Sequence, residues 1–138
     1  MSPRNTTTGK VLEDMVLPAL RRGGYQCETQ QVIGTRFGGG RHIVDAIAKK
    51  NGERYLISLK WQQVGGTAEQ KVPFEVICLA EAVMTSQFAK AYLVLGGEGW
   101  TLRDFYTSGG LKHHLTHAEK VNILTLEGFV AKANQGRL

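Results

Sequence analysis

An aspartate, a serine and a lysine flank a predicted tight turn at a spacing that would gather them on one face of a β-sheet. The turn is Asn51-Gly52, a pair typical of a type I′ hairpin because both central residues need positive φ. In a two-residue loop, residues whose numbers sum to 103 pair, so Asp45 lies opposite Ser58. Lys60 projects from the same face by strand alternation. A carboxylate and an ammonium group partly withdrawn from water must pair with each other, bind a metal ion or stay at an exposed edge. Spacing alone favours a surface ion pair beside a serine.

The elements that must position these residues follow from hydrophobic periodicity and turn residues. Apolar residues at helical spacing predict a first helix over 8–22, kinked or divided at Pro18 and ended by Gly23-Gly24. Strands are predicted at 25–33, 42–49, 54–61, 90–95 and 121–124, and further helices at 67–86, 102–106 and 126–133. The order is αβββαβαβα, which predicts an α/β (α+β) fold with a mixed sheet of about five strands flanked by helices.

Length, charge and cysteine content narrow the class of protein. A chain of 138 residues has room for one domain, residues 1–138, with one core. The net charge of +5 favours an anionic partner, most commonly nucleic acid. We expect a cytoplasmic protein without membrane association, because no apolar run approaches the ~20 residues of a membrane span and no secretory signal is present. Cys27 and Cys78 are expected to be free thiols.

The stretch from Asp45 through Ser58 and Lys60 to Glu75 resembles the PD-(D/E)XK nuclease superfamily. That family places an aspartate at the start of a hairpin and an acidic-x-Lys motif on the second strand of the hairpin, in a restriction-endonuclease-like core. The chain departs from the pattern at two positions. Val44 stands where proline is usual before the aspartate, and Ser58 stands where an acidic residue is usual.

A subset of type II restriction endonucleases is more similar to this sequence. In that subset Ser-x-Lys replaces Glu-x-Lys, and a glutamate on the next helix supplies the missing carboxylate. Glu75 follows Lys60 with fourteen residues between them, and Glu69 is the competing candidate. Gln62 also matches a polar position found in several branches of the superfamily.

In the predicted first helix, Gly9 and Glu13 resemble the Gly-x-x-x-Glu of archaeal Holliday-junction resolvases, in which the glutamate reaches the metal. Glu13 is either such an inward ligand or an exposed first-turn residue.

The resemblance implies a Mg²⁺ site, at which Mn²⁺ would substitute, with oxygen ligands. The candidate ligands are Asp45, Glu75, the backbone carbonyl of Leu59, and Glu13. Lys60 would orient or activate the attacking water and neutralise charge in the transition state. Ser58 and Gln62 complete the expected catalytic group as polar neighbours, with a hydrogen-bonding role for the serine.

A glycine-rich segment, residues 34–40, leads into the strand that carries Asp45. Thr35, Arg36, Gly39 and Arg41 are candidate DNA contacts, because glycines allow close backbone approach and arginines suit phosphates and base edges. The expected function is a metal-dependent endonuclease acting on double-stranded DNA, in a bacterial, archaeal or phage-infected cell. A homodimer would place two sites on opposite strands. A structure-selective, Holliday-junction-type nuclease and a catalytically inactive DNA-binding module are the alternatives.

Overall fold

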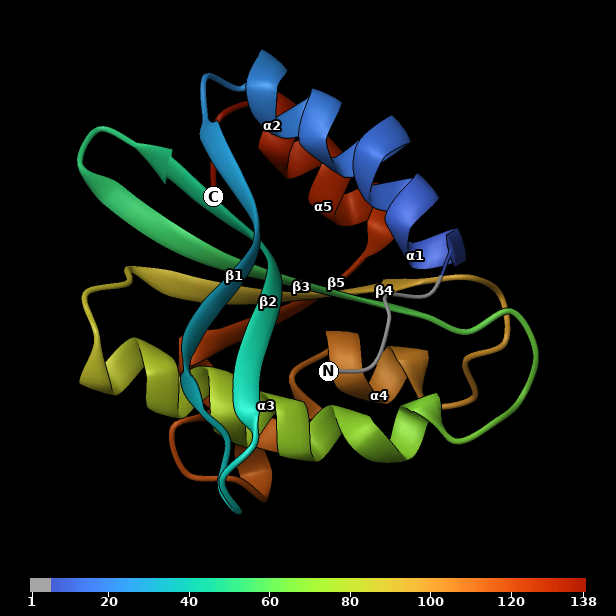
Figure 1. Cartoon of the computed structure of the whole chain (residues 1–138). Coiled ribbons are helices and arrows are strands. Elements are labelled where there is room, and N and C mark those ends of the chain that lie inside the picture. The colour runs from blue at the N-terminus through green and yellow to red at the C-terminus, as the bar shows by residue number, and fades with distance from the viewer. Residues whose placement is uncertain (1–5) are drawn as a thin grey trace.

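A mixed sheet of five strands lies at the centre of the structure, a computed structural model that describes residues 6–138 (Figure 1). The strands lie side by side in chain order: β1 (Gln26–Thr35), β2 (Arg41–Lys50), β3 (Glu53–Trp61), β4 (Lys90–Gly96) and β5 (Val121–Thr125). The pairs β1–β2 and β2–β3 are antiparallel, whereas β3–β4 and β4–β5 are parallel. This sheet and the order of the elements confirm the predicted α+β class.

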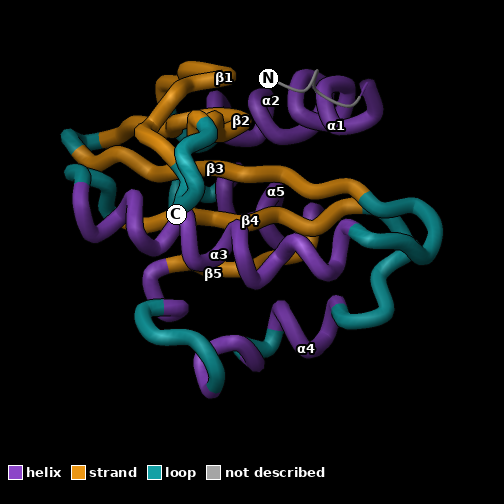
Figure 2. Tube along the Cα trace, turned by 60° about the horizontal axis from the view of Figure 1, so that its bottom comes forward, coloured by secondary structure: helices purple, strands orange, loops and turns teal. Residues whose placement is uncertain are grey.

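Helices cover both faces of the sheet (Figures 1 and 2). One layer contains α1 (Thr6–Val11), a π-helical turn (Leu12–Val16), α2 (Leu17–Arg22) and α5 (Leu126–Asn134). The other contains α3 (Ala68–Thr85), α4 (Arg103–Thr107) and two short 3-10 turns (Gly110–His113 and Ala118–Lys120). The predicted bounds of helices and strands differ from these by one or two residues. Within residues 6–138, no helix has both the length and the apolarity that a membrane span needs.

Pro18 divides the first helical segment, as predicted. The backbone N–H of Leu17 bonds to the carbonyl of Leu12, five residues back, which is the hydrogen bond of a π turn. Pro18 has no N–H to donate and its ring crowds the preceding turn. The π turn absorbs this irregularity, and the segment continues as α2.

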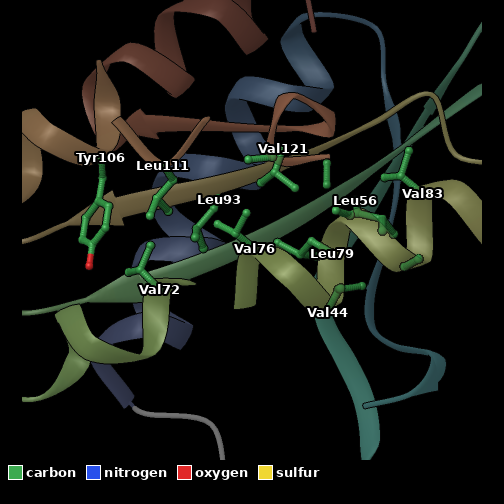
Figure 3. Close-up of a cluster of buried hydrophobic side chains, with 14 of the residues drawn as sticks. Val44, Leu56, Val72, Val76, Leu79, Val83, Leu93, Tyr106, Leu111 and Val121 are labelled. Carbon is green, nitrogen blue, oxygen red and sulfur yellow. The ribbon is translucent and has the colours of Figure 1, made fainter. Parts of the chain in front are cut away.

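Two apolar cores lie on the two faces of the sheet, because side chains alternate along each strand. Leu56 and Leu93 pack under α3 against Val72, Val76 and Leu79 (Figure 3). The intervening strand residues, such as Ile57 and Tyr92, pack under the other layer against its buried side chains: Leu12, Val16, Leu20 and Phe129. On β3 the alternation places Leu56, and by continuation the next even-numbered residues, on the α3 face. Ser58 and Lys60 therefore face α3.

The β2–β3 hairpin has the predicted register. Pairs run from Lys50↔Glu53 to Ala46↔Ile57, and each pair sums to 103. Both turn residues, 51 and 52, have positive φ (54° and 80°), as a type I′ turn requires. Local turn chemistry thus determines which residues of the two strands face each other.

Candidate active site

Glu75 is the centre of a polar cluster between α3 and the sheet, and its residue is only 3% exposed. Arg36 approaches it as a fork, with Nη1 2.9 Å from Oε1 and Nη2 3.3 Å from Oε2. His42 Nε2 lies 3.1 Å from Oε1, and the Ser58 hydroxyl donates to Oε2 at 3.2 Å. Lys60 Nζ lies 3.7 Å from Oε2. Residues from the β1–β2 loop, β2, β3 and α3 therefore meet at one carboxylate.

The surroundings of Glu75 keep its carboxylate ionised. Burial by itself raises the pKa of Glu75, because a charged group is less stable away from water. Hydrogen bonds from His42 and Arg36, together with the charges of Lys60 and Arg36, outweigh burial and hold this pKa well below its usual range. The side chain is therefore an anion at neutral pH, as an ion-pair partner or a metal ligand must be.

Asp45 lies where β2 and β3 separate. Their ladder ends at Ala46↔Ile57, one pair before Asp45, although β2 extends back to Arg41 and β3 forward to Trp61. In place of a strand carbonyl, Asp45 Oδ2 accepts the backbone N–H of Leu59 at 2.7 Å. The carboxylate thus binds the β3 backbone between Ser58 and Lys60.

The strand geometry at Asp45 is irregular, which sequence alternation did not predict. Val44 packs in the core under α3, whereas Ala46, two residues later, packs in the opposite core. Residues two apart in a regular strand share a face, so β2 changes its facing at Asp45. Across the β1–β2 ladder, Gln30 has a φ of 53° between the regular pairs on either side. The predicted register is correct, but Asp45 points toward the gap between the strands.

Glu69, the competing carboxylate, has a different set of contacts. Its Oε1 accepts the backbone N–H groups of Thr101 and Leu102, the residues that lead into α4. The Tyr106 hydroxyl donates to the Glu69 carbonyl at 2.7 Å. Glu69 therefore holds α4 against α3, and of the two candidates Glu75 is the one that contacts Lys60.

Gln62 and Glu13 stand apart from the Glu75 contacts described above. Gln62 follows β3 and donates from Nε2 to the carbonyl of Gly99 at 2.7 Å, which ties it to the loop after β4. That loop needs glycine at position 97, because φ is 90° and a Cβ there would lie 2.4 Å from the Gln62 carbonyl oxygen.

Glu13 is exposed and lies in the helical layer over the other face of the sheet. It does not have the inward orientation considered from the sequence.

The candidate DNA contacts lie at the turn between β1 and β2. The backbone N–H of Arg36 donates to Gly40, and that of Gly39 donates to Arg36. Thr35 pairs with Arg41 at the base of this loop, and both are exposed. The guanidinium of Arg36 is turned toward Glu75, which the sequence did not predict for this residue.

His42 is the member of the cluster that sequence reasoning missed. It is 2% exposed and shares the α3 face with Val44. A polar residue two positions before a core valine on a predicted strand was the available signal, because alternation places both on one face.

Comparisons with known proteins indicate the family and the fold of the chain. The profile of a PD-(D/E)XK nuclease superfamily domain matches residues 4–137. No curated protein matches the sequence significantly. The fold is similar to the crystal structure of a protein of unknown function, AF1548, with a TM-score of 0.51 and 13% sequence identity. The likeness covers 80% of this chain and 54% of that one, so this chain spans about half of that protein's length. At this identity the likeness concerns the fold alone. The chain belongs to the PD-(D/E)XK nuclease superfamily.

Proposed function

We propose that this protein is a divalent-metal-dependent endonuclease that hydrolyses phosphodiester bonds in double-stranded DNA. Membership of a nuclease superfamily supports hydrolysis of a phosphodiester. The net charge of +5 supports a polyanionic substrate. The observation that carries the proposal is the ionised Glu75 beside Ser58 and Lys60, at the point where β2 and β3 separate around Asp45.

The donor groups fit a divalent cation in kind. Mg²⁺ takes oxygen ligands and is commonly held by one or two carboxylates together with waters and substrate phosphates. Asp45, Glu75 and the Leu59 carbonyl supply such oxygens, and Mn²⁺ would substitute. Across residues 6–138, no group of three or more His, Cys, Asp or Glu side chains forms a metal cluster. Water and a DNA phosphate would therefore supply the remaining ligands. When bound, the cation would supply Lewis-acid activation and lower the pKa of a coordinated water.

The protein's own residues bind and orient around this centre. The Lys60 side chain is 31% exposed, so its ammonium group can meet a phosphate or a water without leaving the cluster. There it would orient the attacking water and stabilise negative charge developing on the phosphate. Ser58 and His42 donate hydrogen bonds that fix the orientation of the Glu75 carboxylate. Ser58 carries no charge, so Glu75 takes over the role of the acidic residue that is usual at position 58.

The test is cleavage of plasmid and linear duplex DNA by three purified variants with Mg²⁺ or Mn²⁺. Asp45→Asn and Lys60→Met are expected to lose about 100-fold or more of the cleavage rate. Lys71→Met is the matched control, because it removes one exposed positive charge from α3. Thermal unfolding monitored by circular dichroism checks that each variant is folded. Cleavage at the wild-type rate by Asp45→Asn or by Lys60→Met would contradict the proposal.

Substrate form separates the proposed activity from the alternatives. Cleavage of a covalently closed circle requires an endonuclease, because a circle has no ends. Preference for a four-way junction over linear duplex would favour a structure-selective nuclease. A symmetric homodimer would address both strands of a duplex, and light scattering after size-exclusion chromatography measures its mass.

A second candidate is a DNA-binding module without catalysis. It is favoured by Ser58 at the usual acidic position and by the pairing of Glu75 with Arg36. Retained duplex binding, without cleavage of any DNA form in either metal, would support it.

A further inference from the structure

The Arg36 guanidinium is hydrogen-bonded to both oxygens of Glu75, the carboxylate that the proposed function assigns to a cation. An ionised carboxylate offers about four lone-pair sites for hydrogen bonds. On Oε1 of Glu75 the two donors are Arg36 Nη1 and His42 Nε2. On Oε2 they are Arg36 Nη2 and the Ser58 hydroxyl. Arg36 thus takes two of the four sites, and a cation at Glu75 would also face its positive charge at close range.

Arg36 is the donor of this set that can leave. His42 and Ser58 are 2% and 3% exposed and belong to strands within the sheet. The Arg36 side chain is 27% exposed and follows the last residue of β1. Rotation of its side chain would free two sites on Glu75, whereas release of either other donor would disturb the packed sheet.

There is room for this rotation. A groove of about 340 Å³ opens beside Arg36, between the β1–β2 hairpin and α3, with Cys78 and Glu81 on its helical side. The tip of the loop is unpacked, since a Cβ on Gly38, Gly39 or Gly40 would meet no heavy atom within 4 Å.

We infer that Arg36 holds Glu75 in a pairing that excludes a divalent cation until a DNA phosphate takes the guanidinium. This inference rests on the proposed function and makes Arg36 a positioning residue that responds to substrate. Lys60 and Arg36 both carry positive charge beside Glu75, so an incoming phosphate would meet two cationic side chains there. Arginine binds phosphate with the same two-pronged geometry that it uses toward a carboxylate. DNA and metal would therefore bind cooperatively, each raising the affinity for the other by the same factor.

The experiment measures Mn²⁺ binding to the full chain without DNA, from the electron paramagnetic resonance signal of free Mn²⁺. Arg36→Met is expected to bind Mn²⁺ about tenfold more tightly than the wild type. Arg36→Lys keeps the charge but not the fork, so its affinity should lie between the two. Arg41→Met is the matched control, because it removes an exposed charge from the first residue of β2, at the base of the same loop, and a change below about threefold is expected. Adding Glu75→Gln to Arg36→Met should cancel the gain.

A second arm adds duplex DNA with phosphorothioate linkages, chosen to resist hydrolysis. This DNA should tighten Mn²⁺ binding by the wild type much more than by Arg36→Met. Equal Mn²⁺ affinities of the wild type and Arg36→Met without DNA would overturn the inference. Equal gains for Arg36→Met and Arg41→Met would also overturn it, because general charge would then explain the effect. If the inference fails while the wild type cleaves DNA with Mn²⁺, the proposed function stands. If no protein binds Mn²⁺ or cleaves DNA, both fail.

Discussion

Replacing Glu75 by glutamine tests whether its buried carboxylate is ionised in the folded protein. The substitution preserves shape but keeps only one oxygen, which can accept from His42 or from Ser58 and not from both, and it removes the charge opposite Arg36 and Lys60. Those two side chains are 27% and 31% exposed and can turn to water. The loss at pH 7 should therefore lie below the 3–5 kcal/mol typical of a fully buried broken pair. We expect a decrease of about 2 kcal/mol in the free energy of unfolding, the scale of hydrogen bonds to a charged group.

The stability difference between wild type and Glu75→Gln should depend on pH with a definite sign. The folded-state pKa of Glu75 lies well below its usual value of about 4.5. The carboxylate therefore stabilises the folded state fully above about pH 4.5, and this contribution decreases as the pH falls toward the folded pKa. The limiting slope for one proton is about 1.4 kcal/mol per pH unit. Between pH 7 and pH 3 the wild type should lose about 2 kcal/mol relative to the variant.

Urea unfolding of both proteins at pH 7, 5, 4 and 3 measures this difference. Titration of distant carboxylates cancels in the comparison, because their environments are unchanged. Glu81→Gln is the control, since Glu81 is exposed on the same helix, and its effect should be small at every pH. A difference between wild type and Glu75→Gln that stays constant from pH 7 to pH 3 would refute the depressed pKa and the ion-pair network behind it.

Three further predictions concern the surroundings of the site. Glu69→Gln should cost about 1–2 kcal/mol in urea unfolding, by weakening its bonds to the start of α4; DNA cleavage should stay within about threefold, and its loss would make Glu69 the active carboxylate. The buried Tyr92 hydroxyl has no hydrogen-bond partner among residues 6–138, so Tyr92→Phe should leave stability unchanged or raise it by about 1 kcal/mol. A clear loss of stability in Tyr92→Phe would show that the Tyr92 hydroxyl does make a stabilising hydrogen bond. The double substitution of Arg36 and Arg41 by alanine should weaken DNA binding in fluorescence anisotropy and flatten its salt dependence. An unchanged slope would exclude phosphate contact by these arginines.

Much of the sheet could be predicted because its determinants are local. Asn51-Gly52 sets the register of β2 against β3, since few residue pairs tolerate positive φ at both turn positions. Once the register is set, alternation decides the face of every regular strand residue, including Ser58 and Lys60. Pro18 similarly determined the break in the first helix through its missing N–H.

The choice between Glu69 and Glu75 needed the tertiary structure. The two residues are six apart, so on a helix with 3.6 residues per turn they point about 120° apart. Both directions are covered, one by the sheet and one by the segment entering α4. Helical periodicity alone treats both residues as buried glutamates. Only the positions of β3 and α4 show which one meets Lys60.

The sequence by itself determined the order of the elements, the hairpin register and the face that carries Ser58 and Lys60. The irregular strand at Asp45 and the Arg36–Glu75 pair were decided by tertiary structure. Asp45 departs from alternation because β2 stays with β1 while β3 stays with β4. Arg36 and Glu75 lie 39 residues apart and meet only when the β1–β2 hairpin docks against α3. Such contacts depend on the packing of whole elements, which local propensity and spacing do not encode.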